Sequence, residues 1–194
     1  STIQAKDFAF VDGGWTPAGS WVFHLFYIRH NQLPGVLTAN TEKNMGHAVS
    51  DSLNRWTVLD TAAVKVRAGR FDSQHVWAPS IVKKGLTYYM FYTGVDNSQD
   101  QRIGIATSND LITWVQTDSV LSAGEIPWAD PHPAARGGET QLRDAYVMED
   151  PAVPGGWLMY YVTVAAQYSP DMVVGVARSS GDLHSWGTHS PLWA

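Results

Sequence analysis

The stretch Gly46–Trp56, which reads GHAVSDSLNRW, decides the fold because its pattern occurs three times in the chain. It returns as GIATSNDLITW at Gly104–Trp114 and as GVARSSGDLHSW at Gly175–Trp186, where one residue is added. Each copy is a short apolar strand, then a turn rich in Ser, Asp and Asn, then a Leu with a Trp three residues after it. Such self-similarity indicates a fold built from like units, and we expect the three Trp to pack between them.

Further strands precede and follow each copy. An aromatic strand lies upstream, at residues 21–27, 86–92 and 156–161, and a third strand lies before that, at residues 7–11, 78–82 and 144–148. A fourth short strand follows each Trp, as at residues 56–59. Four antiparallel strands in each unit of roughly 65–70 residues predict an all-β fold, a β-propeller with about three blades present. We expect one domain over residues 1–194, with blades at about 5–60, 75–120 and 142–192, and a β-sandwich is the alternative.

The composition agrees with a β-rich chain. The 194 residues include nine Trp, eight Tyr and six Phe beside 17 Gly and ten Pro, a combination that favours strands between turns. Only Thr61–Ala68 is expected to form a helical turn. The 13 Lys and Arg against 18 Asp and Glu give a net charge of −5 without a basic run, so neither nucleic acid nor a membrane is expected as a partner. The longest apolar stretch, Trp21–Ile28, is too short to span a bilayer.

Several kinds of site are excluded by residue type. Cysteine is absent, which excludes disulfides, thiolate zinc sites and cysteine nucleophiles. The seven His show no paired metal motif, and no Gly-rich phosphate loop lies between a strand and a helix. We therefore expect no metal and no cofactor. The composition leaves the compartment open, because a soluble cytoplasmic protein and an exported one both fit it.

Two carboxylates, Asp7 and Asp144, stand at the same place in the repeat, where the second unit has Ala78. In a propeller the first strand of each blade lines the central channel, so both side chains are predicted to face one axial pocket from different blades. A buried charge needs a partner, and the adjacent Arg143 is expected to lower the carboxyl pKa and keep the group ionised. Paired carboxylates without a metal suit glycoside hydrolysis. The alternative is that both residues start their strands and accept hydrogen bonds from nearby backbone amides.

Other residues are expected to border the same pocket as substrate-binding groups. His75 and Trp77 immediately precede Ala78, so Trp77 can stack on a sugar ring and His75 can bond a sugar hydroxyl. Arg29 and His30 follow the aromatic strand of the first unit and should end near the same mouth. The alternatives are that Trp77 packs at the rim of the channel and that His75 bonds to a backbone carbonyl.

With these residues, the sequence resembles the five-bladed propeller glycosidases of glycoside hydrolase families 43 and 32 over nearly its whole length. GHAVSDSLNRW is similar to a stretch of those enzymes that reads GHA-S-DL-W, and HVWAPS (residues 75–80) with YYMFYTG (residues 88–94) resembles the WAP…YYLFYTG of family 43. LRDA at residues 142–145 resembles their RDP motif. The resemblance implies that Asp7 is the nucleophile or base, that Asp144 stabilises the transition state or tunes the acid, and that Arg143 contacts the substrate.

The chain departs from the family pattern in two respects. Phe8 and Ala145 stand where a Pro often follows each Asp. The family's general acid is a Glu on the fourth blade, beyond the stretch that corresponds to residues 190–194, so the chain corresponds to the first three of five blades. Besides a sugar-cleaving enzyme, the sequence therefore fits a catalytically silent carbohydrate-binding module or a truncated product without a function of its own. An open arc of three blades is also expected to self-associate through its exposed blade edges.

Overall fold

A computed structural model describes residues 2–15, 21–32, 42–168 and 171–192. These residues form twelve strands and three short 3-10 helices, namely η1 (Ala123–Glu125), η2 (Ala134–Arg136) and η3 (Ala166–Tyr168). No helix in this part of the chain is long and apolar enough to cross a lipid bilayer.

The strands make three four-stranded antiparallel sheets, and in each sheet consecutive strands are neighbours. The first contains β1 (Thr2–Trp15), β2 (Trp21–Gln32), β3 (Met45–Ser50) and β4 (Thr57–Leu59). The second contains β5 (His75–Lys84), β6 (Thr87–Val95), β7 (Gln101–Ser108) and β8 (Val115–Leu121). The third contains β9 (Leu142–Glu149), β10 (Trp157–Val164), β11 (Met172–Ser179) and β12 (Gly187–Pro191).

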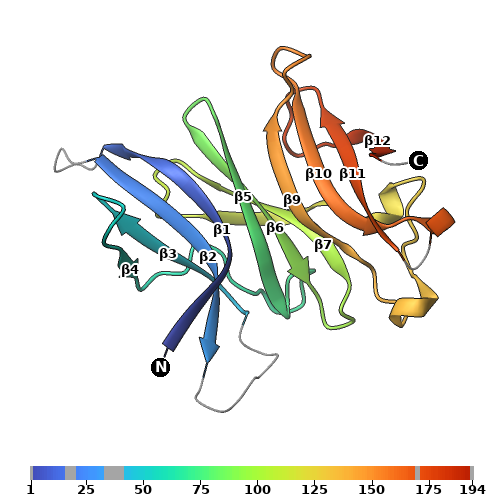
Figure 1. The fold of residues 1–194 in the computed structure, drawn as a ribbon, viewed down its shortest axis with the longest axis horizontal. Coiled ribbons are helices and arrows are strands. Elements are labelled where there is room, and N and C mark those ends of the chain that lie inside the picture. The colour runs from blue at the N-terminus through green and yellow to red at the C-terminus, as the bar shows by residue number, and fades with distance from the viewer. Residues whose placement is uncertain (1, 16–20, 33–41, 169–170, 193–194) are drawn as a thin grey trace.

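The three sheets stand side by side as blades, with the first strand of each sheet innermost. Strands β1 and β9 both contact β5, which lies between them (Figure 1). The predicted all-β fold of four-stranded propeller blades is confirmed, and we call the sheets blades one, two and three in chain order.

A hydrogen bond closes the repeated turn in every blade. The indole N–H of the Trp donates to the carbonyl of the Leu three residues earlier, at 3.2 Å for Trp56, 3.1 Å for Trp114 and 3.0 Å for Trp186. In blades one and two, the hydroxyl of the Ser that begins the turn accepts the backbone N–H of the same Leu. The sequence pattern therefore encodes a local corner that returns the chain to its outermost strand.

A Tyr on the neighbouring strand explains the Gly that opens each copy. The pairs are Gly46 with Tyr27, Gly104 with Tyr92 and Gly175 with Tyr161. A Cβ atom on the Gly would lie 2.5, 2.7 and 2.6 Å from Cζ of the respective Tyr ring. The ring thus covers the bare backbone, and any side chain at the Gly would displace it.

Two apolar clusters fill the spaces between successive blades. Between blades one and two, the edge of the Phe26 ring meets Trp114, with ring centroids 5.4 Å apart. Between blades two and three, Phe91 meets Trp186 in the same manner at 5.8 Å. The expectation that these Trp pack between units is confirmed for Trp114 and Trp186.

The connection from blade one to blade two is extended, so the expectation of a helical turn at Thr61–Ala68 is wrong. The carbonyl of Val64 accepts the backbone N–H of Met45 at 2.7 Å, and Lys65 forms an antiparallel bridge with Asn44. The segment lies beside the end of β3 that β4 leaves uncovered. Pairing with an open strand edge satisfies backbone groups that a helix would have bonded within itself.

A buried carboxylate fastens the same connection to blade two. Asp72 is fully buried, and its Oδ2 accepts Nε–H of Arg67 at 2.9 Å, the hydroxyl of Tyr92 at 2.8 Å and the side-chain amide of Gln116 at 3.1 Å. Several donors together offset the cost of removing this charge from water. We call these four side chains the Asp72 network.

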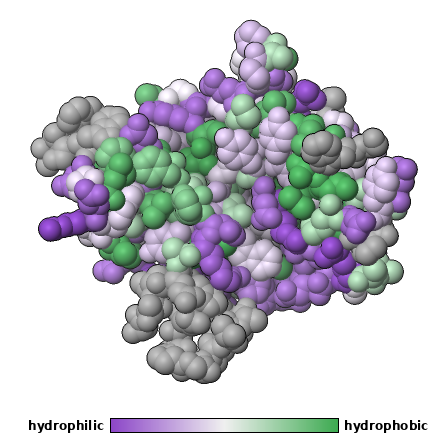
Figure 2. Space-filling model, viewed as in Figure 1, coloured by the Kyte–Doolittle hydropathy of each residue, from purple (hydrophilic) through white to green (hydrophobic). Residues whose placement is uncertain are grey.

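Large apolar side chains also reach the surface. Figure 2 shows apolar residues gathered over β1 and β2 and again over β10 and β11, with polar residues around them. The exposed ones include Phe8 and Phe10 on β1 and Tyr146 on β9. These three lie on inner strands, so they bear on the site described next.

Candidate functional site

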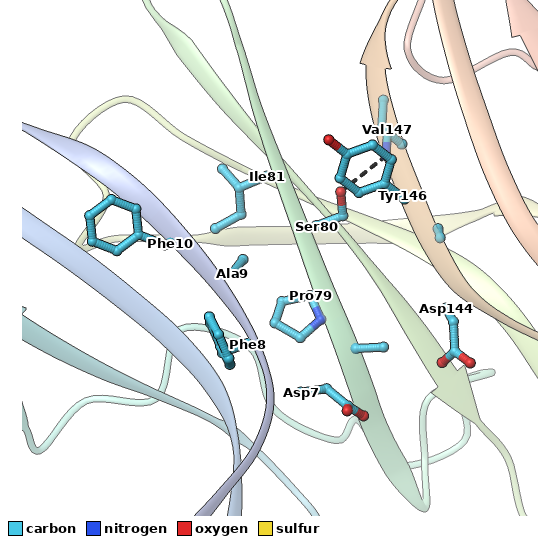
Figure 3. A pocket seen from close by; sticks show the side chains of 12 residues that line it. Asp7, Phe8, Ala9, Phe10, Pro79, Ser80, Ile81, Asp144, Tyr146 and Val147 are labelled. Carbon is cyan, nitrogen blue, oxygen red and sulfur yellow. Dashed lines mark hydrogen bonds between the residues drawn. The ribbon is translucent and has the colours of Figure 1, made fainter.

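A cavity of about 700 Å³ lies between the inner strands of the three blades. Its walls are residues 7–10 of β1, 78–81 of β5 and 144–147 of β9. These are the same four positions of the repeat in each blade, so the cavity runs along the axis around which the blades are arranged. Figure 3 shows Asp7 and Asp144 at one end of the cavity and Phe10, Ile81 and Tyr146 toward the other.

Each inner strand has a β-bulge at the position of the carboxylates. The register with the neighbouring strand shifts between Lys6 and Phe8, between Trp77 and Ser80, and opposite Tyr161 in blade three. The residues at these places have a positive φ, which is 24° for Asp7, 46° for Ala78 and 59° for Asp144. A bulge redirects the side chain of the extra residue, at a cost in backbone strain for any residue except Gly. Blade two has the same bulge with Ala78 in place of an acidic residue. The bulge is therefore a feature of the fold and does not require a carboxylate.

Asp7 and Asp144 are both exposed to the cavity, and the side chain of Asp144 is 48% exposed. The bulge turns both carboxylates toward the open axis, so these inner-strand charges are at most partly withdrawn from solvent. The backbone N–H of Asp144 donates to the hydroxyl of Thr93 in blade two at 3.1 Å, which fixes the bulge from the neighbouring blade.

The pKa of Asp144 is raised above its ordinary value. Partial burial is the main cause; Arg143 acts in the opposite direction, and the negative charge of Asp7 raises the pKa further. The expectation that Arg143 keeps the pKa of Asp144 low is therefore wrong. Nε of Arg143 does lie 3.6 Å from Oδ2 of Asp144, but its attraction is weaker than the effect of desolvation. The effect of Asp7 on this pKa also means that the two carboxylates interact electrostatically.

Two buried glutamines orient Arg143. Its Nη1 donates to Oε1 of Gln141 at 2.6 Å and to Oε1 of Gln101 at 3.2 Å, and Nη2 contacts the sulfur of Met172 at 2.9 Å. Gln101 begins β7 in blade two, so the arginine is held from a neighbouring blade. Sequence reasoning missed both glutamines, because nothing in the spacing of Gln101 and Gln141 relates them to the carboxylates.

The family follows from a comparison of this chain with known families. Residues 17–193 match the model described as the glycosyl hydrolases family 32 N-terminal domain. The chain belongs to this family. A comparison with curated protein sequences finds no match.

Solved structures of glycosidases share the fold of this family 32 domain. A thermostable family-43 glycoside hydrolase matches with a TM-score of 0.61 and 17% identity, over 88% of this chain and 48% of its own. A family 32 β-fructofuranosidase from Bombyx mori matches with a TM-score of 0.63 and 19% identity, over 96% and 36%. Fructan 1-exohydrolase IIa from Cichorium intybus matches with a TM-score of 0.66 and 22% identity, over 88% and 30%. The family 32 domain described here thus spans less than half the length of these enzymes, and the likeness shows a glycoside hydrolase-like fold.

His75 and Trp77 lie on the strand that supplies the middle wall of the cavity, just before its lining residues. The ring of buried His75 stacks on Trp77, with centroids 5.2 Å apart. Nδ1 of His75 and Nε1 of Trp77 are buried without a hydrogen-bond partner. Burial lowers the pKa of His75, which favours the neutral imidazole. The residues that line the cavity include neither of these two, so their contact with a ligand stays a prediction.

Arg29 and Arg143 also lie outside the cavity walls. Arg29 is on β2, with its backbone N–H bonded to the carbonyl of Asn44 at 3.1 Å and its Nε buried without a partner. His30 belongs to β2 as well, but its side chain is outside the described part of the structure. The roles assigned to Arg29, His30 and Arg143 as substrate contacts stay predictions.

The opposite end of the cavity is apolar. Phe10 of blade one and Tyr146 of blade three are exposed there, while Phe8 lies nearer to Asp7 (Figure 3). Within the described residues, no group of three or more His, Asp or Glu side chains is placed to hold a metal ion. The chemistry that the cavity offers is therefore that of two carboxylates beside aromatic faces.

Proposed function

We propose that the cavity between the three blades binds a glycoside, with a furanoside as the first choice, and that Asp7 and Asp144 act on it as a carboxylate pair. The observation that carries this proposal is that both carboxylates occupy the same bulged position and line the same end of one cavity. Membership of glycosyl hydrolase family 32 supports a sugar as the ligand. Two structural relatives are a β-fructofuranosidase and a fructan exohydrolase, which suggests a fructofuranoside as the probe.

The two carboxylates would have different tasks. Asp7 would attack the anomeric carbon as nucleophile, or remove a proton from the attacking water, while the glycosidic bond breaks through an oxocarbenium-like transition state. Asp144 would stabilise the positive charge on the sugar ring. Arg143, held by its two glutamines beside Asp144, would donate hydrogen bonds to a sugar hydroxyl. Exposed aromatic faces in the cavity wall, such as Phe8, would contact the apolar face of the ring.

A second candidate is binding without cleavage. Among the described residues that line the cavity, Asp7 and Asp144 are the only acidic ones. If these serve as nucleophile and stabiliser, a third group must protonate the leaving alcohol. A cavity with two acids favours sugar binding, or the cleavage of substrates whose leaving group needs no proton.

An activated substrate separates these possibilities. We expect the protein to hydrolyse an aryl fructofuranoside, whose phenolate leaves without acid assistance, faster than an alkyl fructofuranoside, whose leaving group needs a proton. Asp7→Asn should abolish turnover and keep the melting temperature. Asp51→Asn, at an exposed carboxylate in the turn after β3, is the matched control and should leave turnover unchanged.

Calorimetric titration with a fructofuranoside distinguishes the outcomes. Turnover that depends on Asp7 supports the hydrolase. Binding without turnover in both the native protein and Asp7→Asn supports the binding module. Neither binding nor turnover with any furanoside or pyranoside probe refutes the proposal that the cavity is a sugar site.

A further inference from the structure

Two hydroxyl groups of blade two bond to the inner strand of blade three. Oγ1 of Thr93, on β6, accepts the backbone N–H of Asp144 at 3.1 Å, and Oγ of Ser80, on β5, accepts that of Val147 at the same distance. Both Thr93 and Ser80 are buried. These bonds lie inside the interface between blades two and three, and the first of them ends on a residue that carries a cavity carboxylate.

Packing alone does not explain the hydroxyl of Thr93. The residues at the same place of the repeat in blades one and three are Ile28 and Val162. Thr93 is fully buried, and a buried hydroxyl is unfavourable unless it forms a hydrogen bond. An apolar residue would fill this place at a lower cost. The bond to Asp144 therefore gives the hydroxyl a purpose that packing does not.

The bulge of blade three explains why Asp144 needs a partner outside its own sheet. Asp144 and Ala145 both lie opposite Tyr161, so the ladder of hydrogen bonds between β9 and β10 is interrupted there. Thr93 supplies the acceptor, and it is itself in register with Trp77, which immediately precedes the bulge of blade two. The hydrogen bond thus connects the bulged regions of two neighbouring blades.

The bulge of blade two indicates what the hydroxyl adds. Ala78 also has a positive φ, 46° against 59° for Asp144, although blade one has Ile28 at the place of Thr93. A bulge therefore forms without this hydrogen bond. What the bond adds is an anchored N–H at Asp144, and the anchored backbone fixes the direction in which the side chain leaves it.

We propose that Thr93 is a positioning residue for the carboxylate of Asp144. Its hydroxyl holds the bulge from blade two, so that the side chain of Asp144 keeps one direction in the cavity, at the same end as Asp7. A displacement of about 1 Å in a reacting group can reduce a rate by about 100-fold, so such anchoring affects catalysis. The effect on Asp144 needs no ligand, whereas the effect on catalysis rests on the proposed function.

Nuclear magnetic resonance titration of the Asp144 carboxyl group tests the positioning without a sugar. Thr93→Val keeps the shape of the side chain and removes the acceptor. Asp144 then gains freedom and water, so its raised pKa, on which Arg143 and Asp7 also act, should move down toward the ordinary value. Thr93→Ser keeps the hydroxyl and should retain the native pKa. If circular dichroism shows that Thr93→Val fails to fold, Thr93→Cys, with a weaker acceptor of similar size, replaces it.

Ser80→Ala is the matched control for the titration. It removes the other hydroxyl that bonds to β9, at the same distance but three residues further along the strand. Both variants therefore lose the same kind of bond between the same two blades, and only Thr93→Val should shift the pKa of Asp144. A native pKa in Thr93→Val, or an equal shift in Ser80→Ala, overturns the proposal.

Turnover of an aryl fructofuranoside measures the consequence for catalysis. In Thr93→Val we expect kcat to fall about tenfold or more while KM changes about twofold or less, because the cavity keeps its size and only the placement of Asp144 is disturbed. Thr117→Val, which removes an exposed hydroxyl on β8, should keep the native kcat. A native kcat in Thr93→Val overturns the catalytic role. Absence of turnover in the native protein contradicts the proposed function instead, and the titration then decides the role of Thr93 by itself.

Discussion

A buried pair of histidines in blade one makes its stability depend on pH. Nδ1 of His24 lies 2.8 Å from Nε2 of His47, both residues are buried, and the ring of Phe26 stacks on that of His47 with centroids 4.2 Å apart. Burial, with a smaller contribution from His24, lowers the pKa of His47 from 6.5 to about 3. Burial lowers the pKa of His24 as well.

The sign of the effect follows from proton binding. Below pH 6.5 the unfolded chain protonates His47 and the folded chain does not until about pH 3, so the stability is complete above pH 6.5 and decreases as the pH falls toward 3. The lowered pKa of His24 acts in the same direction. One histidine with these two pKa values lowers the free energy of unfolding by about 2 kcal/mol between pH 7.5 and pH 5.

The repeat indicates which residues can replace the two histidines in a variant that no longer titrates at these positions. Blade three has Leu158 and Val176 at the positions of His24 and His47. In the double variant His24→Leu/His47→Val, we expect the loss of stability between pH 7.5 and pH 5 to be smaller than in the native protein by about 2 kcal/mol or more, by urea denaturation at both pH values. His132→Gln, at an exposed imidazole, should keep the native dependence. Equal losses in the native protein and the double variant, or a nuclear magnetic resonance titration of His47 near pH 6.5, would refute the reasoning.

Three further predictions concern packing, the Asp72 network and the arginine beside Asp144. Gly104→Ala places a Cβ atom 2.5 Å from a phenylalanine ring and should cost about 2 kcal/mol or more in urea denaturation, whereas Gly124→Ala, with nothing within 4 Å, should be close to neutral. Asp72→Ala removes a fully buried carboxylate, leaves half-buried Arg67 without its ionic partner and should cost about 3–5 kcal/mol, whereas Asp118→Ala in an exposed ion pair should cost about 1 kcal/mol or less. Equal costs would contradict the role of burial. Gln141→Met removes the oxygen that accepts a hydrogen bond from Arg143 at 2.6 Å, and calorimetric titration with a fructofuranoside should show about tenfold weaker binding. Unchanged affinity would contradict the role of Gln141 in orienting Arg143.

The blades could be predicted from the sequence because their determinants are local. The Leu of each corner lies three residues from the Trp that bonds to it, and the Gly of each copy is in contact with the Tyr of the adjoining strand. Interactions across short separations leave a pattern that repeats with the unit. The equivalence of Asp7, Ala78 and Asp144 followed from the same alignment, and these residues do occupy equivalent bulges.

The surroundings of the carboxylates could not be predicted in the same way. The pKa of Asp144 reflects burial, Arg143 and Asp7 together, and the net direction is opposite to the one expected from the neighbouring arginine alone. Gln101 reaches Arg143 from another blade across 42 positions of the chain. Such contacts depend on how blades pack, and no sequence spacing records them.

The sequence by itself determined the number and order of the strands in each blade, because strand alternation, turn chemistry and the Gly–Tyr contact act between near neighbours. Only the tertiary structure decided which side chains line the axial cavity and how far each is exposed. The physical reason is that the bulge of an inner strand and the packing of adjacent blades set the direction of a side chain, and both arise when strands distant in the sequence come together.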